Sequence, residues 1–181
     1  MIPRFIALAL VSLCVPLPVA AAPLTERACH ISGIETPVRC TQLSVPLDWS
    51  APSGKAITIA AVIVPALTAH PANDPLLVLA GGPGQAASDM GPWLSSAFKD
   101  VRQTRDIVFF DMRGTGLSGK LDCAFDTNPG ADAMAHLRRD AAACVARFGD
   151  DLRHYTHREI VDDIDAWRAA AGIDRLDLWG G

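Results

Sequence analysis

The chain has 181 residues, with 16 Lys and Arg against 20 Asp and Glu, which gives a formal net charge of −4. Half of the residues are hydrophobic and a fifth are charged, so the composition is that of one folded domain rather than a disordered segment. A nucleic-acid-binding surface is excluded, because it would need clustered Lys and Arg, and no basic run occurs.

Residues 1–21 have the pattern of a secretory signal peptide. Arg4 supplies a positive start, residues 5–17 form an apolar run, and small residues at 19–22 allow cleavage near Ala21. The run is too short and too interrupted for a membrane span. We therefore expect an exported protein, periplasmic or secreted, in which residues 22–181 form one domain without membrane association after cleavage.

Four cysteines remain after this cleavage, at positions 29, 40, 123 and 144. An even number of cysteines in an exported chain predicts two disulfides, for which three connectivities exist. We favour the nearest-neighbour pairing, which joins Cys29 to Cys40 and Cys123 to Cys144. No two of these cysteines have the close spacing of a zinc knuckle, so no zinc site is expected.

Five strands are predicted after a polar lead-in. Alternation over 38–45 and β-branched residues over 56–64 indicate two strands in hairpin-like succession. A continuous apolar run at 76–80 indicates a strand that is covered on both faces, and residues 106–110 indicate another buried strand. Residues 175–179 form the last predicted strand.

Three helices are predicted between the later strands. The first is a short helix within 93–101, and the second covers 134–148, where apolar residues recur on one face that we expect to be buried. The third begins at a capping box of Thr156 and Glu159 and ends at Gly172. Its expected buried face consists of Ile160, Val161, Ile164, Trp167 and Ala171. The element order predicts an α/β fold with a mostly parallel sheet and flanking helices.

Three loops follow the later strands. Gly81-Gly82-Pro83-Gly84 follows the first buried strand, Asp111-Met112-Arg113-Gly114-Thr115-Gly116-Leu117-Ser118 follows the second, and Gly180-Gly181 follows the last. Glycines lack the Cβ that would block close approach of the backbone, so the first loop could direct bare N–H groups at a reacting oxygen. The alternative for a lone Gly-Gly-Pro-Gly is an ordinary tight turn.

In this order and spacing the loops resemble those of α/β-hydrolases of the prolyl aminopeptidase and tripeptidyl aminopeptidase group. The resemblance runs from about Cys40 to Gly181, and the 45–49 segment, the Cys123/Cys144 pair and Tyr155-Thr156 look like the secreted branch of that group. Many cytosolic relatives have His where this chain has Ala80. The nucleophile elbow of the family is Gly-x-Ser-x-Gly, and Gly180-Gly181 matches only its first two positions.

The resemblance implies a role for each loop. Gly81 and Gly82 would belong to the oxyanion-hole loop, which stabilises negative charge on the reacting carbonyl oxygen. The serine nucleophile would follow Gly181, with the catalytic acid and histidine further downstream. We therefore expect the chain to be the N-terminal part of a hydrolase fold, truncated at the elbow and inactive alone.

Asp111 and Arg113 are expected to pair with each other and to hold their loop in a structural role, while Gly114 and Gly116 serve the turn. His154 and His157 stand near two aspartates, which would suit a metal site or a solvated helix start; we favour the helix start. No cofactor or metal is implied.

The leading hypothesis is an exported serine hydrolase, an exopeptidase that releases residues or short peptides from peptide N-termini. A second is an esterase on the same fold, because a fold does not fix a substrate. A third is a secreted binding domain without catalysis. The expected partner is a peptide or small ester substrate, and not a nucleic acid or a membrane.

Overall fold

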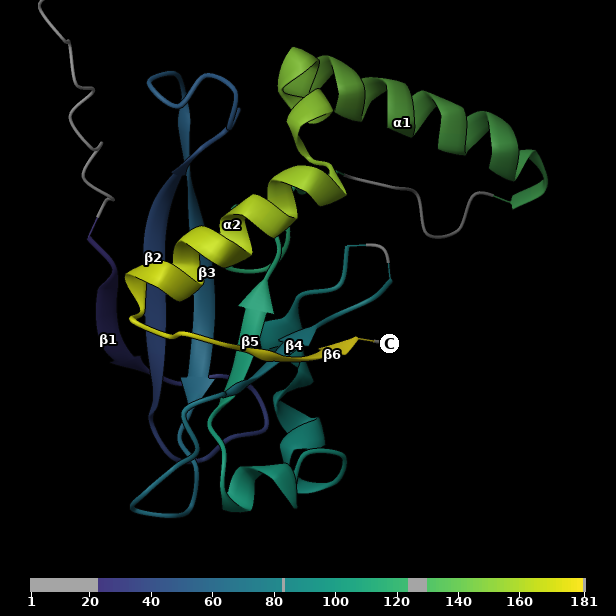
Figure 1. Cartoon of the computed structure of the whole chain (residues 1–181). Helices are drawn as coiled ribbons and strands as arrows, with labels where there is room; N and C mark the ends of the chain where they lie inside the picture. The colour runs from purple at the N-terminus through teal and green to yellow at the C-terminus, as the bar shows by residue number, and fades with distance from the viewer. Residues whose placement is uncertain (1–22, 83, 124–129, 181) are drawn as a thin grey trace, which may run out of the picture.

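The computed structural model of the chain describes residues 23–82, 84–123 and 130–180. Six strands form one sheet in the order β1-β2-β3-β5-β4-β6 (Figure 1). The strands are β1 Thr25–Cys29, β2 Val38–Pro46, β3 Ala56–Val64, β4 Leu76–Leu79, β5 Ile107–Asp111 and β6 Asp177–Gly180. The predicted signal peptide, residues 1–21, lies outside the described residues.

The sheet is mixed, so the expectation of a mostly parallel sheet is wrong for the described residues. Strand β2 pairs antiparallel with β1 and β3, and β3 pairs antiparallel with β5. Parallel pairing is confined to β5, β4 and β6. The reason lies in the connections: parallel neighbours need a long crossover, and only the links from β4 to β5 and from β5 to β6 carry helices.

Strand β1 was not predicted, because its residues have no apolar alternation. Four of its five residues are exposed, and it forms one edge of the sheet. Its register on β2 places Cys29 opposite Val38, and the bridge to Cys40 ties the two strands together. Charged residues on an edge strand hinder pairing with other chains, so this polar sequence suits its place.

Helical segments connect the later strands. The α-helices are α1 Ala133–Phe148 and α2 His157–Ala170, and the 3₁₀ segments are η1 Ala87–Ser95, η2 Val101–Gln103, η3 Gly130–Asp132 and η4 Gly149–His154. The prediction of a short helix within 93–101 is wrong, because η1 begins at Ala87 and η2 is a single turn. Pro92 lies inside η1, and its missing N–H does not favour a regular α-helix there.

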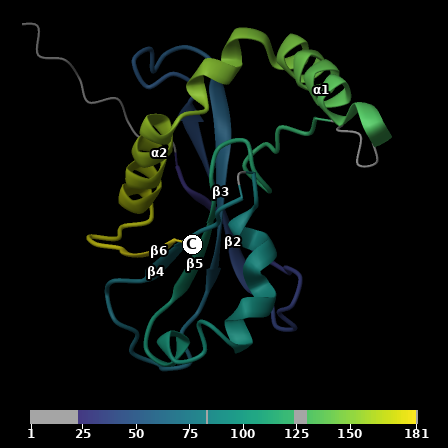
Figure 2. The same ribbon diagram turned by 90° about the vertical axis from the view of Figure 1, so that its right-hand side faces the viewer.

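The two faces of the sheet are covered by different connections. Met90 of η1 belongs to the core cluster that contains Phe109, whereas Trp167 of α2 belongs to the cluster that contains Phe110. The rings of Phe110 and Trp167 meet edge to face with centroids 6.0 Å apart. Since successive strand residues point to opposite faces, β5 is buried on both sides by η1 and α2 (Figure 2).

Helix α1 differs from the prediction in its surroundings. It covers the predicted residues, but Met134, Leu137 and Val145 of its apolar face are 60%, 49% and 57% exposed. The helix stands apart from the sheet in both views (Figures 1 and 2). A periodic apolar stripe predicts that a helix forms, and it does not identify what covers the stripe. Within the described residues, none of the helices has the length and apolar character needed to cross a membrane.

Candidate active site at the carboxyl edge of the parallel strands

The three parallel strands end side by side. Strand β4 lies between β5 and β6, with Val78 opposite Phe109 and Leu79 opposite Gly180. The loops that follow these strands therefore start at one edge of the sheet. They are residues 81–85, called here the 81–85 loop, and residues 112–118, called the 112–118 loop, with Gly180 at the end of β6.

This edge is also where the winding of the sheet reverses. The connection from β4 to β5 passes η1 on one face, and the connection from β5 to β6 passes α2 on the other face and crosses β4. In open α/β sheets, ligands bind outside the carboxyl ends of the strands at such a switch point. The switch point here is the end of β4, from which the 81–85 loop emerges.

The described residues of the 81–85 loop present much of their backbone to solvent. Gly82 has φ +120°, and a Cβ placed on it would lie 3.1 Å from the Gln85 nitrogen and 3.2 Å from the Gly84 nitrogen. Two backbone nitrogens thus approach the space that a side chain at Gly82 would fill. Gly81 is half-buried, whereas Gly82 and Gly84 are exposed.

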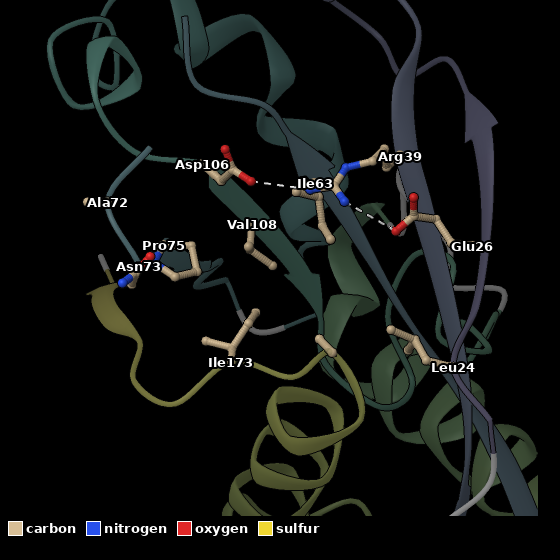
Figure 3. Close-up of a pocket in the computed structure, with 11 residues that line it drawn as sticks. Leu24, Glu26, Arg39, Ile63, Ala72, Asn73, Pro75, Asp106, Val108 and Ile173 are labelled. Atoms are coloured by element: carbon tan, nitrogen blue, oxygen red, sulfur yellow. Dashed lines mark hydrogen bonds and ion pairs between the residues drawn. The ribbon is translucent and has the colours of Figure 1, made fainter. Parts of the chain in front are cut away.

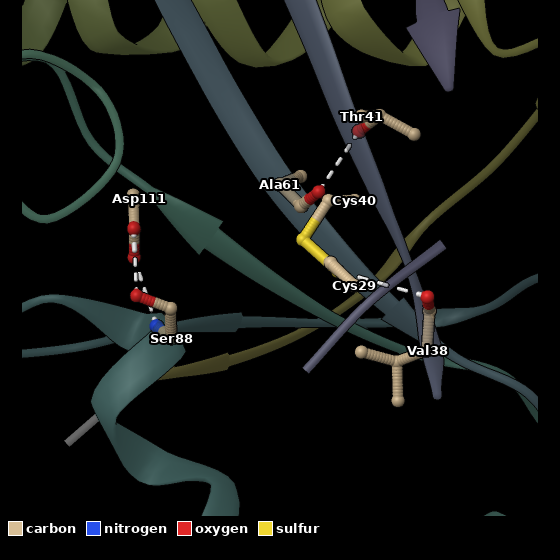
Figure 4. The surroundings of a disulfide bond; sticks show 7 residues. All are labelled: Cys29, Val38, Cys40, Thr41, Ala61, Ser88 and Asp111. Atoms are coloured by element: carbon tan, nitrogen blue, oxygen red, sulfur yellow. Dashed lines mark hydrogen bonds between the residues drawn. A yellow bond between two sulfur atoms is a disulfide. The ribbon is translucent and has the colours of Figure 1, made fainter. Parts of the chain in front are cut away.

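Asp111 does not pair with Arg113, and that expectation is wrong. Its carboxylate is buried and accepts hydrogen bonds from the Ser88 N–H and the Ser88 hydroxyl, each at 2.8 Å (Figure 4). It also accepts a hydrogen bond from the Leu117 N–H at 2.8 Å. Asp111 follows the alternation of β5 onto the face of Phe109 and η1, whereas the chain turns after Asp111 and carries Arg113 towards α2. The two charged side chains thus make their contacts on different faces of the sheet.

Arg113 pairs with Asp163 of α2 instead. Its Nε and Nη2 donate to the two carboxylate oxygens at 2.7 Å each, and neither side chain is exposed. The remaining donors of the guanidinium reach the carbonyl oxygens of Leu47, His154 and Pro46. Planar guanidinium groups suit this bidentate arrangement, so Arg113 joins the 112–118 loop, the end of β2, η4 and α2.

Asp163 is a buried residue that the sequence prediction missed. It also accepts a hydrogen bond from Trp49 Nε1 at 3.0 Å. Burial raises the pKa of the Asp163 carboxyl, while the hydrogen bonds from Arg113 and Trp49 act in the opposite direction. The available signal was its position between Ile160 and Trp167 on the apolar face of α2. Val161, which was expected on that face, is 63% exposed.

Gly114 and Gly116 occupy positions that require glycine. Their φ angles are +80° and +41°, and a Cβ on Gly116 would lie 2.3 Å from a carboxylate oxygen of Asp111. A Cβ on Gly114 would lie 2.9 Å from the ring of Tyr155. Both positive φ angles are ones that glycine adopts without the strain that a Cβ would add.

Both disulfides have the predicted pairing. The Cα atoms of Cys29 and Cys40 are 5.8 Å apart, and those of Cys123 and Cys144 are 5.5 Å apart. The first bridge lies in the β1–β2 pair and is drawn in Figure 4. The second joins the segment after the 112–118 loop to α1.

The two histidines near α2 lie in different settings. Nε2 of His154 is 3.9 Å from a carboxylate oxygen of Asp48, and His157 is the first residue of α2. Hydrogen bonds from Ser50 lower the pKa of Asp48. In the described segments, no group of three or more His, Cys, Asp and Glu residues could hold a metal ion.

Thr156 is the N-cap of α2, but its hydroxyl donates to the carboxylate of Glu159 rather than capping the backbone.

A cavity of about 210 Å³ lies at the opposite end of the strands. Pro75 and Asp106, which precede β4 and β5, line it, and so do Arg39 and Ile173 (Figure 3). Arg39 bridges Asp106 and Glu26 at its rim. Its place at the amino ends of the parallel strands separates this cavity from the switch point.

Comparisons with known proteins agree with a hydrolase. The chain is 28% identical to tripeptidyl aminopeptidase of Streptomyces lividans over 167 residues, which cover 82% of this chain and 31% of that protein. It is 34% identical to carboxylesterase B of Mycobacterium tuberculosis, over 73% of this chain and 29% of that protein. It is 26% identical to serine protease Hip1 of the same organism, over 78% of this chain and 30% of that protein.

No protein-family model matches the chain. The chain spans about a third of the length of these relatives. The similarities to an aminopeptidase, a carboxylesterase and a serine protease support membership of an α/β-hydrolase-like family.

Proposed function

We propose that the chain supplies the N-terminal part of an exported serine hydrolase. The observation that carries this proposal is the meeting of the 81–85 loop, the 112–118 loop and the end of β6 at the topological switch point. The two disulfides favour export, because such bonds persist in oxidising compartments.

In the proposed mechanism, the nucleophile is a serine that follows Gly181. The elbow places this serine directly after β6, and β6 is the neighbour of β4. Backbone N–H groups of the 81–85 loop, around Gly81 and Gly82, donate to the carbonyl oxygen as it becomes negative. One such donor contributes about 2.7–4 kcal/mol to the lowering of the barrier. The catalytic acid and histidine come from the downstream polypeptide.

The favoured substrate is the N-terminal end of a peptide. Tripeptidyl aminopeptidase and serine protease Hip1, whose names denote peptide-bond hydrolysis, both match most of this chain. The same oxyanion loop also serves ester hydrolysis, because both reactions pass through a tetrahedral intermediate. The relative named carboxylesterase B has the higher identity, 34% against 28% for the aminopeptidase, which favours an esterase as the second candidate.

The test compares the 181-residue chain with a version extended by the residues encoded after Gly181. Both are treated with a serine-directed fluorophosphonate and then with aminoacyl amides, tripeptidyl amides and simple esters. We expect labelling and amide turnover only in the extended version. Ester turnover without amide turnover would identify the esterase, and an unlabelled extended version would overturn the hydrolase in favour of a binding domain.

A pair of glycine variants tests the loop assignment in the extended version. Gly82→Ala places a methyl group against the nitrogens of Gly84 and Gln85, so turnover should fall by roughly 10²–10³-fold. Gly172→Ala is the control, because Gly172 also has a positive φ, +69°, but has open space around it after α2. Equal turnover in the two variants would contradict an oxyanion role for the 81–85 loop.

A further inference from the structure

The described residues of the 81–85 loop offer few side chains that could hold it in place. Its described residues include Gly81, Gly82 and Gly84, which carry no side chains to pack, and Gln85 is exposed. Its conformation is therefore set by its two ends. The first end is β4, which is paired on both sides. The second end is the start of η1, where Ala86, Ala87 and Ser88 are buried.

The second end is held by a single carboxylate. Oδ1 of Asp111 accepts from the Ser88 N–H, and Oδ2 accepts from the Ser88 hydroxyl and from the Leu117 N–H. Asp111 is itself fixed, because it is 1% exposed and pairs with Ala60 of β3. One side chain therefore connects the segment after the 81–85 loop with the 112–118 loop.

We propose that Asp111 is a positioning residue for the hydrolytic reaction: by holding Ser88 it sets the place of the 81–85 loop relative to the nucleophile. This inference rests on the proposed function. Oxyanion stabilisation depends on donors that are already placed where the negative charge develops, and a displacement of about 1 Å can cost about 10²-fold in rate. The contribution of Asp111 should thus be seen in the transition state rather than in substrate binding.

Asp111→Asn tests the role with little change of volume. An amide has one acceptor oxygen, and its NH₂ group would face the Ser88 N–H in one orientation or the Leu117 N–H in the other. Neither orientation restores all three hydrogen bonds. Ser88→Ala is the graded variant, because it removes the hydroxyl and keeps the N–H bond to Oδ1.

Thr41→Val is the matched control. The Thr41 hydroxyl is fully buried, donates to the carbonyl oxygen of Ala61 and accepts from Trp167 Nε1, each at 3.0 Å. It lies in β2 on the side of the sheet that α2 covers. Its loss should lower stability as much as the loss of the Asp111 bonds, without reaching the 81–85 loop.

The kinetic experiment uses the extended version of the enzyme. For Asp111→Asn we expect kcat to fall by about 10–100-fold with KM within about threefold, and a smaller fall for Ser88→Ala. The affinity for a peptide aldehyde, which forms a tetrahedral adduct, should fall by the same factor as kcat/KM. Thr41→Val should lower Tm and leave kcat unchanged.

Hydrogen exchange on the 181-residue chain gives a reading that does not need activity. Asp111→Asn should speed amide exchange at Ser88 and Leu117, whose N–H groups the carboxylate binds, whereas Thr41→Val should not. Slow exchange in both variants, or a kcat for Asp111→Asn equal to that of Thr41→Val, would overturn the positioning role alone. An extended wild-type enzyme that neither reacts with a fluorophosphonate nor turns over substrate would overturn the proposed function and this role together.

Discussion

Substitution of Asp163 by Asn probes the bond between the 112–118 loop and α2. The carboxylate is fully buried; Oδ2 accepts from Arg113 Nε, and Oδ1 accepts from Arg113 Nη2 and from Trp49 Nε1. An Asn side chain offers one acceptor oxygen for these three donors. Its NH₂ group would point at a donor in either orientation, and the guanidinium would stay buried without its counter-charge.

The expected loss is large for one side chain. Removing one partner of a buried ion pair costs about 3–5 kcal/mol, because the remaining charge is uncompensated. In a domain of this size each kcal/mol lowers Tm by about 2–4 °C, so Tm should fall by about 6–20 °C. The loss should fall on the folded state, since Asp163 in the unfolded chain is hydrated.

Urea unfolding followed by tryptophan fluorescence measures this difference, with thermal unfolding as a second reading. Asp165→Asn is the control in the same helix: it removes an ion pair with Arg168 in which the carboxylate is 71% exposed. Exposed pairs at this spacing contribute about 0.2–0.5 kcal/mol. If Asp163→Asn lost no more stability than Asp165→Asn, the buried pair would not be what joins the loop to the helix.

Three further outcomes are expected. In urea unfolding, Gly116→Ala should lower the free energy of unfolding by about 2 kcal/mol more than Gly119→Ala. Both sites have a positive φ, but only a Cβ at position 116 would meet the buried carboxylate of Asp111, at 2.3 Å; equal losses would contradict this. Replacing Cys29 and Cys40 by Ala should cost about 2–4 kcal/mol relative to the oxidised protein, and an unchanged urea midpoint would show that the bridge adds nothing. Burial raises the pKa of Tyr155, the one tyrosine, so the absorbance of its tyrosinate should develop above the usual pH of about 10. The contribution of this shift to the free energy of unfolding should be present below that pH and be lost as the pH rises through the folded-state pKa. A native titration that coincides with the denatured one would contradict the burial of the ring.

Local patterns were sufficient for much of the fold. The apolar runs that gave β4 and β5 are buried on both faces, and the alternation over 38–45 gave β2. The disulfide pairs were predicted by proximity in sequence, and the structure has both. These features depend on residues near one another in the chain, and pattern reasoning reads such features directly.

The features that were missed depend on distant partners. Strand β1 is polar, and its pairing with β2 is visible only once the Cys29–Cys40 bridge and the sheet edge are known. The antiparallel pairing of β3 with β5 has the same origin, because no local signal tells a strand which neighbour it will have. The exposed stripe of α1 carries the same periodicity as the buried face of α2, so periodicity could not separate the two helices.

The candidate site shows the same division. The glycines at 81, 82, 114 and 116 were identified in loops that follow two predicted strands, which is a local signal, and the oxyanion role of the first two came from the family resemblance. The partners of the two charged residues were not identified, since Asp111 and Arg113, which are separated by one residue, were expected to pair with each other. Asp163 lies 50 residues after Arg113 and in another element.

The Asp-x-Arg pattern at the end of β5 is better explained as two residues that bind different connections of the sheet than as one ion pair. Asp111 belongs to the face of η1 and holds Ser88, which follows the 81–85 loop, whereas Arg113 lies beyond the turn and holds Asp163 of α2. Each charged residue thus fastens one of the two crossover connections, which lie on opposite faces of the sheet, to the same strand end. The loops that meet at the switch point belong to connections on opposite faces of the sheet, so holding both connections keeps these loops in place relative to each other. Two charged residues separated by one position can hold both connections, because β5 ends at Asp111. The chain turns before Arg113, so the two side chains point to opposite faces of the sheet.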